Sequence, residues 1–272
     1  MPLTGRGFSA AFEAIAENWR GAVVSADSWV PKSAAGVEGG QASGYFVSSG
    51  TLNGFAKPST LDADNIPRAA HEKISADLGY DLGLPMCPVI LHQWTAPPAG
   101  NQPNVAISLV PFSSVFKWGV VAGIADVAAK LQAEIAPWAS RMVAFDTWLS
   151  NADRVNDGNL LVSKATHQDR GSALSCAYID YSYTMLHSWR AGHGNMGCVG
   201  PYPCGVSAVD VSVLTDTISK IEQVSDGAIN DVVTRLPANF LSTSDGQLIV
   251  DGLIYRRGHL RATLRQTFGG IP

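Results

Sequence analysis

The stretch FDTWLSNADRVNDGNLLV, residues 145–162, separates a long apolar pattern from a short one. Upstream, apolar side chains recur at steps of three or four from Ile124 to Leu149, which predicts a buried helix. Downstream, the run Asn159–Val162 has the composition of a strand. The Asp, Asn and Gly residues in between are typical of a tight loop, because such side chains bond to nearby backbone. The stretch is therefore either a turn alone or a turn that carries chemistry.

A second carboxylate appears where burial is expected. Asp180 lies within the apolar run CAYIDYSYTML, residues 176–186, and a buried carboxylate without a partner is costly. A structural salt bridge would satisfy it. The order Asp153, Asn159, strand, turn, Asp180 is also the order that phosphoryl transfer requires. One carboxylate orients the acceptor hydroxyl and accepts its proton, while an amide oxygen and a second carboxylate hold Mg²⁺ on nucleotide phosphates.

The same chemistry predicts a lysine on an upstream strand and an acid on the helix that follows. Lys57 ends the strand-like run NGFAK, and Glu72 lies in the first turns of a helix expected to start near Pro67 and to stop at Gly83. A glycine-rich segment, Gly36–Gly44, precedes Lys57. Taken singly, Lys57 reads as a solvated charge and the glycine-rich segment as a surface loop. The ordered combination favours a nucleotide site.

The rest of the chain predicts an α+β fold with two lobes. Residues 1–112 are expected to form a β-rich lobe that carries one helix, with a hairpin or meander at 44–57 and strands within 87–94 and 104–112. Residues 113–272 are expected to form a mainly helical lobe with one hairpin near its start. Pro137 should split or kink the helix that ends at Leu149.

Composition narrows the function classes. The 272 residues are 46% hydrophobic and 15% charged, which is typical of a globular protein. A net charge of −4 without a Lys/Arg stripe argues against direct nucleic-acid binding. No apolar run approaches the roughly 18 residues that span a bilayer, and the first residues lack a signal-peptide pattern, so no membrane association is expected. We expect a cytoplasmic protein with reduced cysteines.

Four motifs resemble the HipA-like kinases, a branch of the bilobal protein-kinase-like fold related to the phosphoinositide kinases. The catalytic segment 145–162, with Asn-x-Asp-Arg and a closing Asn-Leu-Leu, and the run YIDYSYTML are the more specific two. HEKISADLGYDLGLPMCPVIL resembles the family's helix, which carries an acid and ends in a Gly-Leu-Pro turn, and GLIYRRGHLRATL resembles its Arg-Arg-containing terminal helix. The resemblance touches roughly residues 40 to 265 and is patchy between the motifs.

The resemblance implies an ATP- and Mg²⁺-dependent kinase that acts on a Ser/Thr hydroxyl of a protein or on a small-molecule alcohol. In the nucleotide site, Lys57 pairs with the phosphates and Glu72 holds Lys57. Leu109 and Val110 belong to the hinge against which the purine lies. A regulatory protein partner, such as a DNA-binding antitoxin, stays open.

In the catalytic segment the resemblance makes Asp153 the catalytic base and Asn159 and Asp180 the magnesium ligands. Two departures occur. Val155 replaces a histidine that is common in the family, and Asn159 stands one position further from Asp153 than in the family. Either Gly158 absorbs the extra residue, or Asn156 takes the metal role, or the site has lost its activity. The corresponding alternatives are a pseudokinase that acts as a nucleotide-binding or scaffolding module, and an AMP transferase on the same fold.

Other polar residues have simpler expected roles. Arg154 is expected to brace the loop against a carboxylate such as Asp146 or Asp157. The remaining histidines, His71 among them, are expected to be surface or capping residues. One further group, His187, His193, Cys198 and Cys204, lies close together in sequence. It is expected to form either a solvated loop, or a structural zinc site, or an oxidisable cysteine pair.

Overall fold

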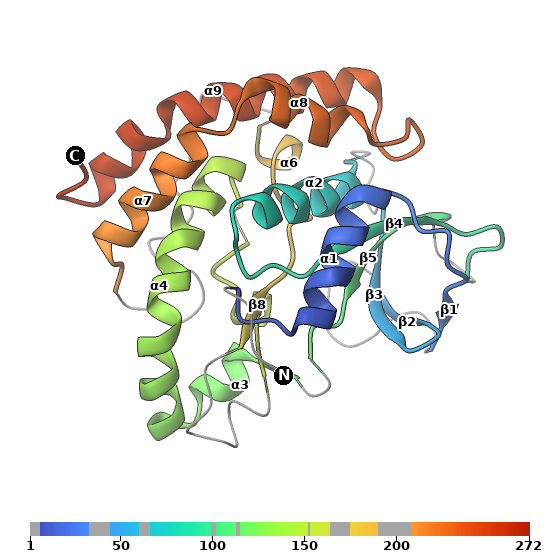
Figure 1. Ribbon diagram of the computed structural model, residues 1–272, viewed down its shortest axis with the longest axis horizontal. Helices are drawn as coiled ribbons and strands as arrows, with labels where there is room; N and C mark the ends of the chain where they lie inside the picture. Colours follow the sequence, from blue (N-terminus) through green and yellow to red (C-terminus); the bar gives the residue numbers. More distant parts are fainter. Residues whose placement is uncertain are drawn as a thin grey trace.

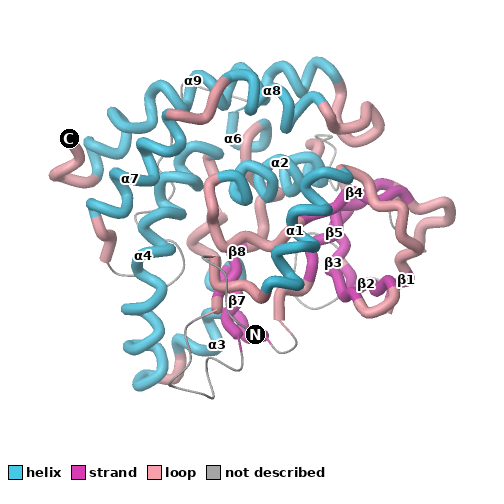
Figure 2. Tube along the Cα trace, in the orientation of Figure 1, coloured by secondary structure: helices cyan, strands magenta, loops and turns pink. Residues whose placement is uncertain are grey.

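The computed structural model describes residues 6–32, 44–59, 66–98, 102–112, 115–151, 153–163, 175–189 and 208–272. The five strands of the N-terminal half lie toward one side of the molecule and the long helices of the C-terminal half lie toward the other (Figure 1), which confirms the α+β class. Figure 2 shows the β-rich side packed beside the long helices of the C-terminal half. The boundary expected between residues 112 and 113 lies between the two sheets and stays a prediction.

The N-terminal sheet has five antiparallel strands in the order β1-β2-β3-β5-β4. Their bounds are β1 Val30–Pro31, β2 Tyr45–Ser49, β3 Leu52–Pro58, β4 Val89–Gln93 and β5 Asn104–Leu109. The predicted hairpin and strands are confirmed, and Lys57 lies opposite Ala106 near the end of β3. Between β1 and β2 the chain carries the glycine-rich segment, of which Gly36 to Ser43 lie outside the described residues.

Helix α2, Arg68–Asp81, is the helix predicted after Pro67, and it ends before Gly83, whose φ of 70° suits a residue without Cβ. A second helix in this lobe was not predicted: α1, Ala10–Ala22, follows the N-cap Ser9. The expectation of one helix was therefore wrong. The spacing of Phe12, Ala16 and Trp19, which form the buried face of α1, was the signal for it.

The second sheet has the order β6-β7-β8, with β6 Val115–Lys117, β7 Leu160–Ser163 and β8 Cys176–Tyr178. Strands β7 and β8 form the hairpin expected in the helical half. Asp180 was expected inside the second strand of this hairpin, which is wrong, because β8 ends at Tyr178. Asp180 instead follows the strand with a φ of 66°, a conformation that L-residues rarely adopt.

Helix α4, Ala125–Leu149, continues through Pro137, so the expected split is wrong. It packs against α7, Val211–Glu222, and α9, Thr243–Thr267. The remaining described helical elements are α3 Trp118–Ala122, α6 Leu186–Trp189, α8 Asp226–Thr234 and the 3₁₀ turn η1 Asp157–Asn159. Trp148, fully buried at the end of α4, donates its indole N–H to Leu253 O of α9 over 2.9 Å. This hydrogen bond positions the end of α4 relative to α9. Over the described ranges, no helix has the length and apolar character to cross a bilayer.

Candidate active site

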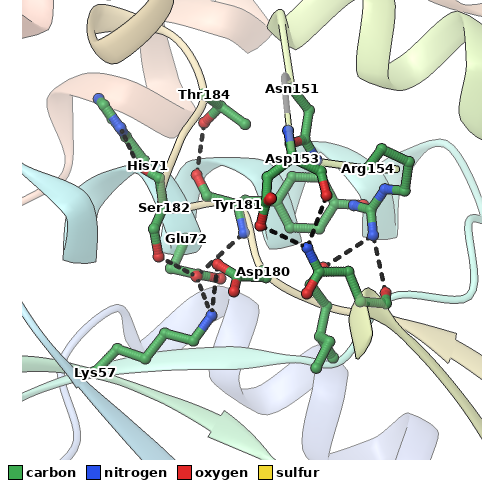
Figure 3. A network of polar contacts seen from close by, with 12 residues as sticks. Lys57, His71, Glu72, Asn151, Asp153, Arg154, Asp180, Tyr181, Ser182 and Thr184 are labelled. Carbon is green, nitrogen blue, oxygen red and sulfur yellow. Dashed lines mark hydrogen bonds and ion pairs between the residues drawn. The ribbon is translucent and has the colours of Figure 1, made fainter. Parts of the chain in front are cut away.

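Three side chains from three elements meet between the two lobes. Lys57 Nζ of β3 lies 2.6 Å from Glu72 Oε1 of α2 and 2.9 Å from Asp180 Oδ1, which follows β8. Figure 3 shows Lys57 reaching toward both carboxylates. The side chains of Lys57 and Glu72 are 8% and 2% exposed, whereas that of Asp180 is 25% exposed. The side chain of Asp180 is therefore the most exposed to solvent of the three.

The charges of this group stabilise one another. Burial alone would lower the pKa of Lys57, but Asp180 and Glu72 together hold that pKa above its usual value. Burial alone would raise the pKa of Asp180, but Lys57 lowers it to about 2. Lys57 thus stays protonated and Asp180 ionised throughout the neutral range, as phosphate pairing and metal binding require.

The loop after α4 folds back on itself in two successive turns. Asn156 N–H donates to Asp153 O over 3.1 Å, and Asn159 N–H donates to Asn156 O over 2.9 Å. The two turns carry Asn159 back to Asp153, where its Nδ2 donates to Asp153 Oδ2 over 2.8 Å. Asn156 Oδ1 accepts from Gly158 N–H over 2.9 Å, so Asn156 caps η1. Turn η1 therefore lies between Asn156 and Leu160, in the part of the loop that brings Asn159 beside Asp153.

The amide of Asn159 is oriented by Asp153. Because Nδ2 donates both to Asp153 O and to Asp153 Oδ2, Oδ1 is the remaining side-chain atom of Asn159 that can accept a hydrogen bond or bind a metal ion. Amide and carboxylate oxygens are the protein ligands that Mg²⁺ prefers. Asn159 Oδ1 and the carboxylate of Asp180 fit that requirement, and Ile179 N–H donates to Asn159 O over 3.1 Å, which ties the two segments together.

Arg154 braces the site, as predicted. Its Nε donates to Asp146 Oδ2 over 2.7 Å, and both side chains are 1% exposed. Its Nη1 donates to the backbone oxygens of Asn159 and Ile179, each over 2.9 Å. A single guanidinium therefore joins helix α4, the loop that follows it and the segment that leads to Asp180. Of the two proposed partners, Asp146 is the one in contact.

Several contributors were not singled out from the sequence. Asn151, fully buried, accepts Asp153 N–H at its Oδ1 over 3.1 Å and donates to Asp146 Oδ1, so it sets the start of the loop. An Asn two positions before an Asp in a loop is a recognisable signal for such a turn.

His71 was expected at the surface or at a helix cap, which is wrong: it is fully buried in α2, and burial lowers its pKa to about 3. Its neighbours Ala70 and Glu72 are buried too, and α2 has no wholly exposed face.

The two residues expected to form a nucleotide hinge line a cavity of about 570 Å³ between α1 and the ends of β2, β3 and β5. Leu109 and Val110 contribute to it, together with Phe12, Phe46 and Asn53. Lys57 and Asp180 do not line it. Val110 N–H already donates to Asn53 O over 2.9 Å, so that donor is occupied within the sheet.

The group considered for zinc falls largely outside the described residues. His193, Cys198 and Cys204 lie there. His187 is the second residue of α6 and packs edge-on against Tyr183 with ring centroids 4.6 Å apart. The described cysteines, Cys87 and Cys176, are buried free thiols, and burial raises the pKa of each.

A β-rich lobe that presents a Lys–Glu pair, joined to a helical lobe that presents an Asp/Asn loop and an Asp after a hairpin, defines a protein with a kinase-like fold. The chain is similar in structure to the proinflammatory kinase CtkA of Helicobacter pylori, with a TM-score of 0.57 and 13% sequence identity. The similarity covers 86% of this chain and 92% of the CtkA chain. No protein-family model and no curated protein sequence matches the chain.

Proposed function

We propose that the chain is an ATP- and Mg²⁺-dependent phosphotransferase of the HipA-like type. The observation that carries the proposal is that Glu72 and Asp180 both lie within 2.9 Å of the Lys57 ammonium, beside a loop that pairs Asp153 with Asn159. The acceptor is a Ser/Thr hydroxyl of a protein or a small-molecule alcohol. A regulatory protein partner is part of the same proposal.

Each side chain has a role that its environment supports. Lys57 is held charged by two carboxylates and pairs with nucleotide phosphates. Asp180 and Oδ1 of Asn159 supply oxygen ligands for Mg²⁺, which bridges the phosphates and offsets their charge. Asp153 is braced by Asn159 Nδ2, so its carboxylate is positioned to orient an acceptor hydroxyl and accept its proton.

The experiment compares Asp153→Ala and Asp180→Ala with wild type. Phosphoryl transfer to a panel of acceptors and to the protein itself is followed by intact mass, and nucleotide binding by the thermal shift with ATP and with ATP plus Mg²⁺. We expect Asp153→Ala to abolish transfer while keeping the shift, and Asp180→Ala to lose the part of the shift that needs Mg²⁺. Undiminished transfer by Asp180→Ala would refute the proposal, as would a wild type without any shift.

The altered spacing between Asp153 and Asn159 favours a second candidate, a pseudokinase that binds nucleotide without turnover. A Mg²⁺-dependent shift without a mass change on any acceptor is its expected result. Transfer of AMP by the same site gives an added mass that differs from that of a phosphoryl group. Any Asp153-dependent phosphorylation excludes the pseudokinase.

A further inference from the structure

Two neighbouring residues of helix α2, His71 and Glu72, contact the segment after Asp180. Glu72 Oε1 accepts the backbone N–H of Tyr181 over 3.1 Å and the hydroxyl of Ser182 over 2.8 Å. His71 Nδ1 lies 3.3 Å from Ser182 O (Figure 3), and because a carbonyl only accepts, Nδ1 carries the proton. Two consecutive residues of α2 therefore hold Ser182 by its hydroxyl and by its carbonyl.

These contacts lie in a dry environment. His71 is fully buried, and Ser182 and Glu72 are 1% and 2% exposed. Polar contacts away from water are stronger than exposed ones. A buried polar group that loses its partner destabilises the folded protein, because its desolvation is no longer compensated. Glu72 Oε1 also accepts from Lys57 Nζ. One carboxylate oxygen thus joins β3, α2 and the segment that follows Asp180.

The contacts of Ser182 matter because the backbone of Asp180, two residues earlier, has an unusual conformation. Its φ of 66° is a conformation that persists only where the surroundings impose it. Ser182, two positions after it, is held by His71 and Glu72 and also hydrogen-bonds to Asp180 through its side chain and its backbone. Ile179 O, just before Asp180, accepts from Arg154 Nη1 over 2.9 Å. Asp180 is therefore fixed from both flanks, while its carboxylate stays the exposed member of the ion-pair group.

We propose that Ser182 is a positioning residue, whose hydroxyl, by binding Glu72, aims the carboxylate of Asp180 for Mg²⁺ and couples that aim to the position of α2. This inference rests on the proposed function. The side chain of Ser182 does not touch nucleotide or acceptor in it, and acts through Glu72 and Asp180. Its loss should weaken the use of Mg²⁺ and leave the binding of the acceptor unchanged.

The test is a Mg²⁺ titration of Ser182→Ala at fixed ATP, read by thermal shift and by initial rate. We expect the Mg²⁺ concentration for half of the effect to rise about tenfold, the range for losing one hydrogen bond to a charged group, with an unchanged KM for the acceptor. The control is Ser140→Ala, which removes another fully buried serine hydroxyl, in α4, that donates to Ala136 O over 2.8 Å. Ser140→Ala should keep the wild-type Mg²⁺ dependence.

A second measurement separates positioning from general damage. In a Glu72→Gln background the effect of Ser182→Ala on the Mg²⁺ titration should shrink, since the acceptor of the hydroxyl is already uncharged. An unchanged Mg²⁺ dependence in Ser182→Ala overturns the inference, and so does a loss of the same size in both backgrounds. If wild type itself shows no Mg²⁺-dependent shift, the proposed function fails first; if wild type responds and Ser182→Ala matches it, only this inference fails.

Discussion

Asn159 Nδ2 donates to Asp153 Oδ2 over 2.8 Å across six positions of the chain. The contact exists because two short turns in succession, from Asp153 to Asn156 and from Asn156 to Asn159, return the chain to its start. A spacing that departs from the HipA-like pattern therefore still places an amide beside the candidate base.

Asn159→Ala is expected to lower phosphoryl transfer by a factor of about 10² or more, because it removes an oxygen ligand and the donor that orients Asp153. Asn156→Ala removes the cap of η1 and should cost about 1 kcal/mol of stability while keeping the Mg²⁺ dependence. Rates at saturating and limiting Mg²⁺, with urea unfolding of both variants, make the comparison. A Mg²⁺ defect confined to Asn156→Ala would assign the metal role to Asn156 instead.

Asp180 gives a prediction about acid. Its folded-state pKa of about 2 lies below the unfolded value of about 4, so the ionised carboxylate stabilises the fold above pH 4 and that contribution is lost as pH falls through 2. The difference in unfolding free energy between wild type and Asp180→Asn should therefore shrink from pH 5 to pH 2.5, as measured by urea unfolding. Asp216→Asn, which alters an exposed pair with Lys220, should show a small difference at every pH. A difference for Asp180→Asn that stays constant over this range would contradict the assignment.

Arg154→Met is expected to destabilise the protein by about 3 to 5 kcal/mol, because Asp146 is left charged and fully buried. Burial raises the pKa of Asp146, and Arg154 opposes that rise. Arg154→Met combined with Asp146→Asn should recover part of the loss in a urea-unfolding cycle. Arg261→Met, which breaks a more exposed pair with Glu222, should cost at most about 1 kcal/mol. Equal losses for the two single variants would show that burial of the pair does not matter.

Helix α2 has a second anchor in the other lobe. Asp77 Oδ1 accepts from Lys73 Nζ over 2.9 Å, and Asp77 Oδ2 pairs with Arg235, which follows α8. Asp77 and Lys73 are 4% and 0% exposed at their side chains, so Arg235→Met should cost about 2 kcal/mol and lower the rate of transfer by loosening Glu72.

The matched control for Arg235 is Arg257→Met. Arg257 pairs with Asp226, whose side chain is 66% exposed, so its loss should be small in stability and absent in rate. Urea unfolding and initial rates at saturating ATP measure both effects. A normal rate in Arg235→Met would show that the Lys57–Glu72 contact does not depend on this anchor.

Much of the architecture follows from local patterns. The apolar periodicity up to Leu149 and the hairpin-like runs on both sides of residues 164–174 predicted the elements around the catalytic loop, because each pattern reflects one buried face. Helix α1 was not predicted, since only Phe12, Ala16 and Trp19 form its buried face and each of them has a polar neighbour in the sequence. Pro137 does not divide α4, because tertiary packing can override the low helix propensity of a proline.

The sequence by itself determined the order of the candidate groups: Lys57, Glu72, Asp153, Asn159, Asp180. It also determined the local turn chemistry, since Asn and Asp bond to backbone within a few residues. Only the tertiary structure decided that Lys57 contacts both Glu72 and Asp180, that Arg154 selects Asp146, and that Ser182 binds Glu72. Those contacts join residues far apart in the chain, and they form because packing of the two lobes removes the charged groups from water, where each must find a partner.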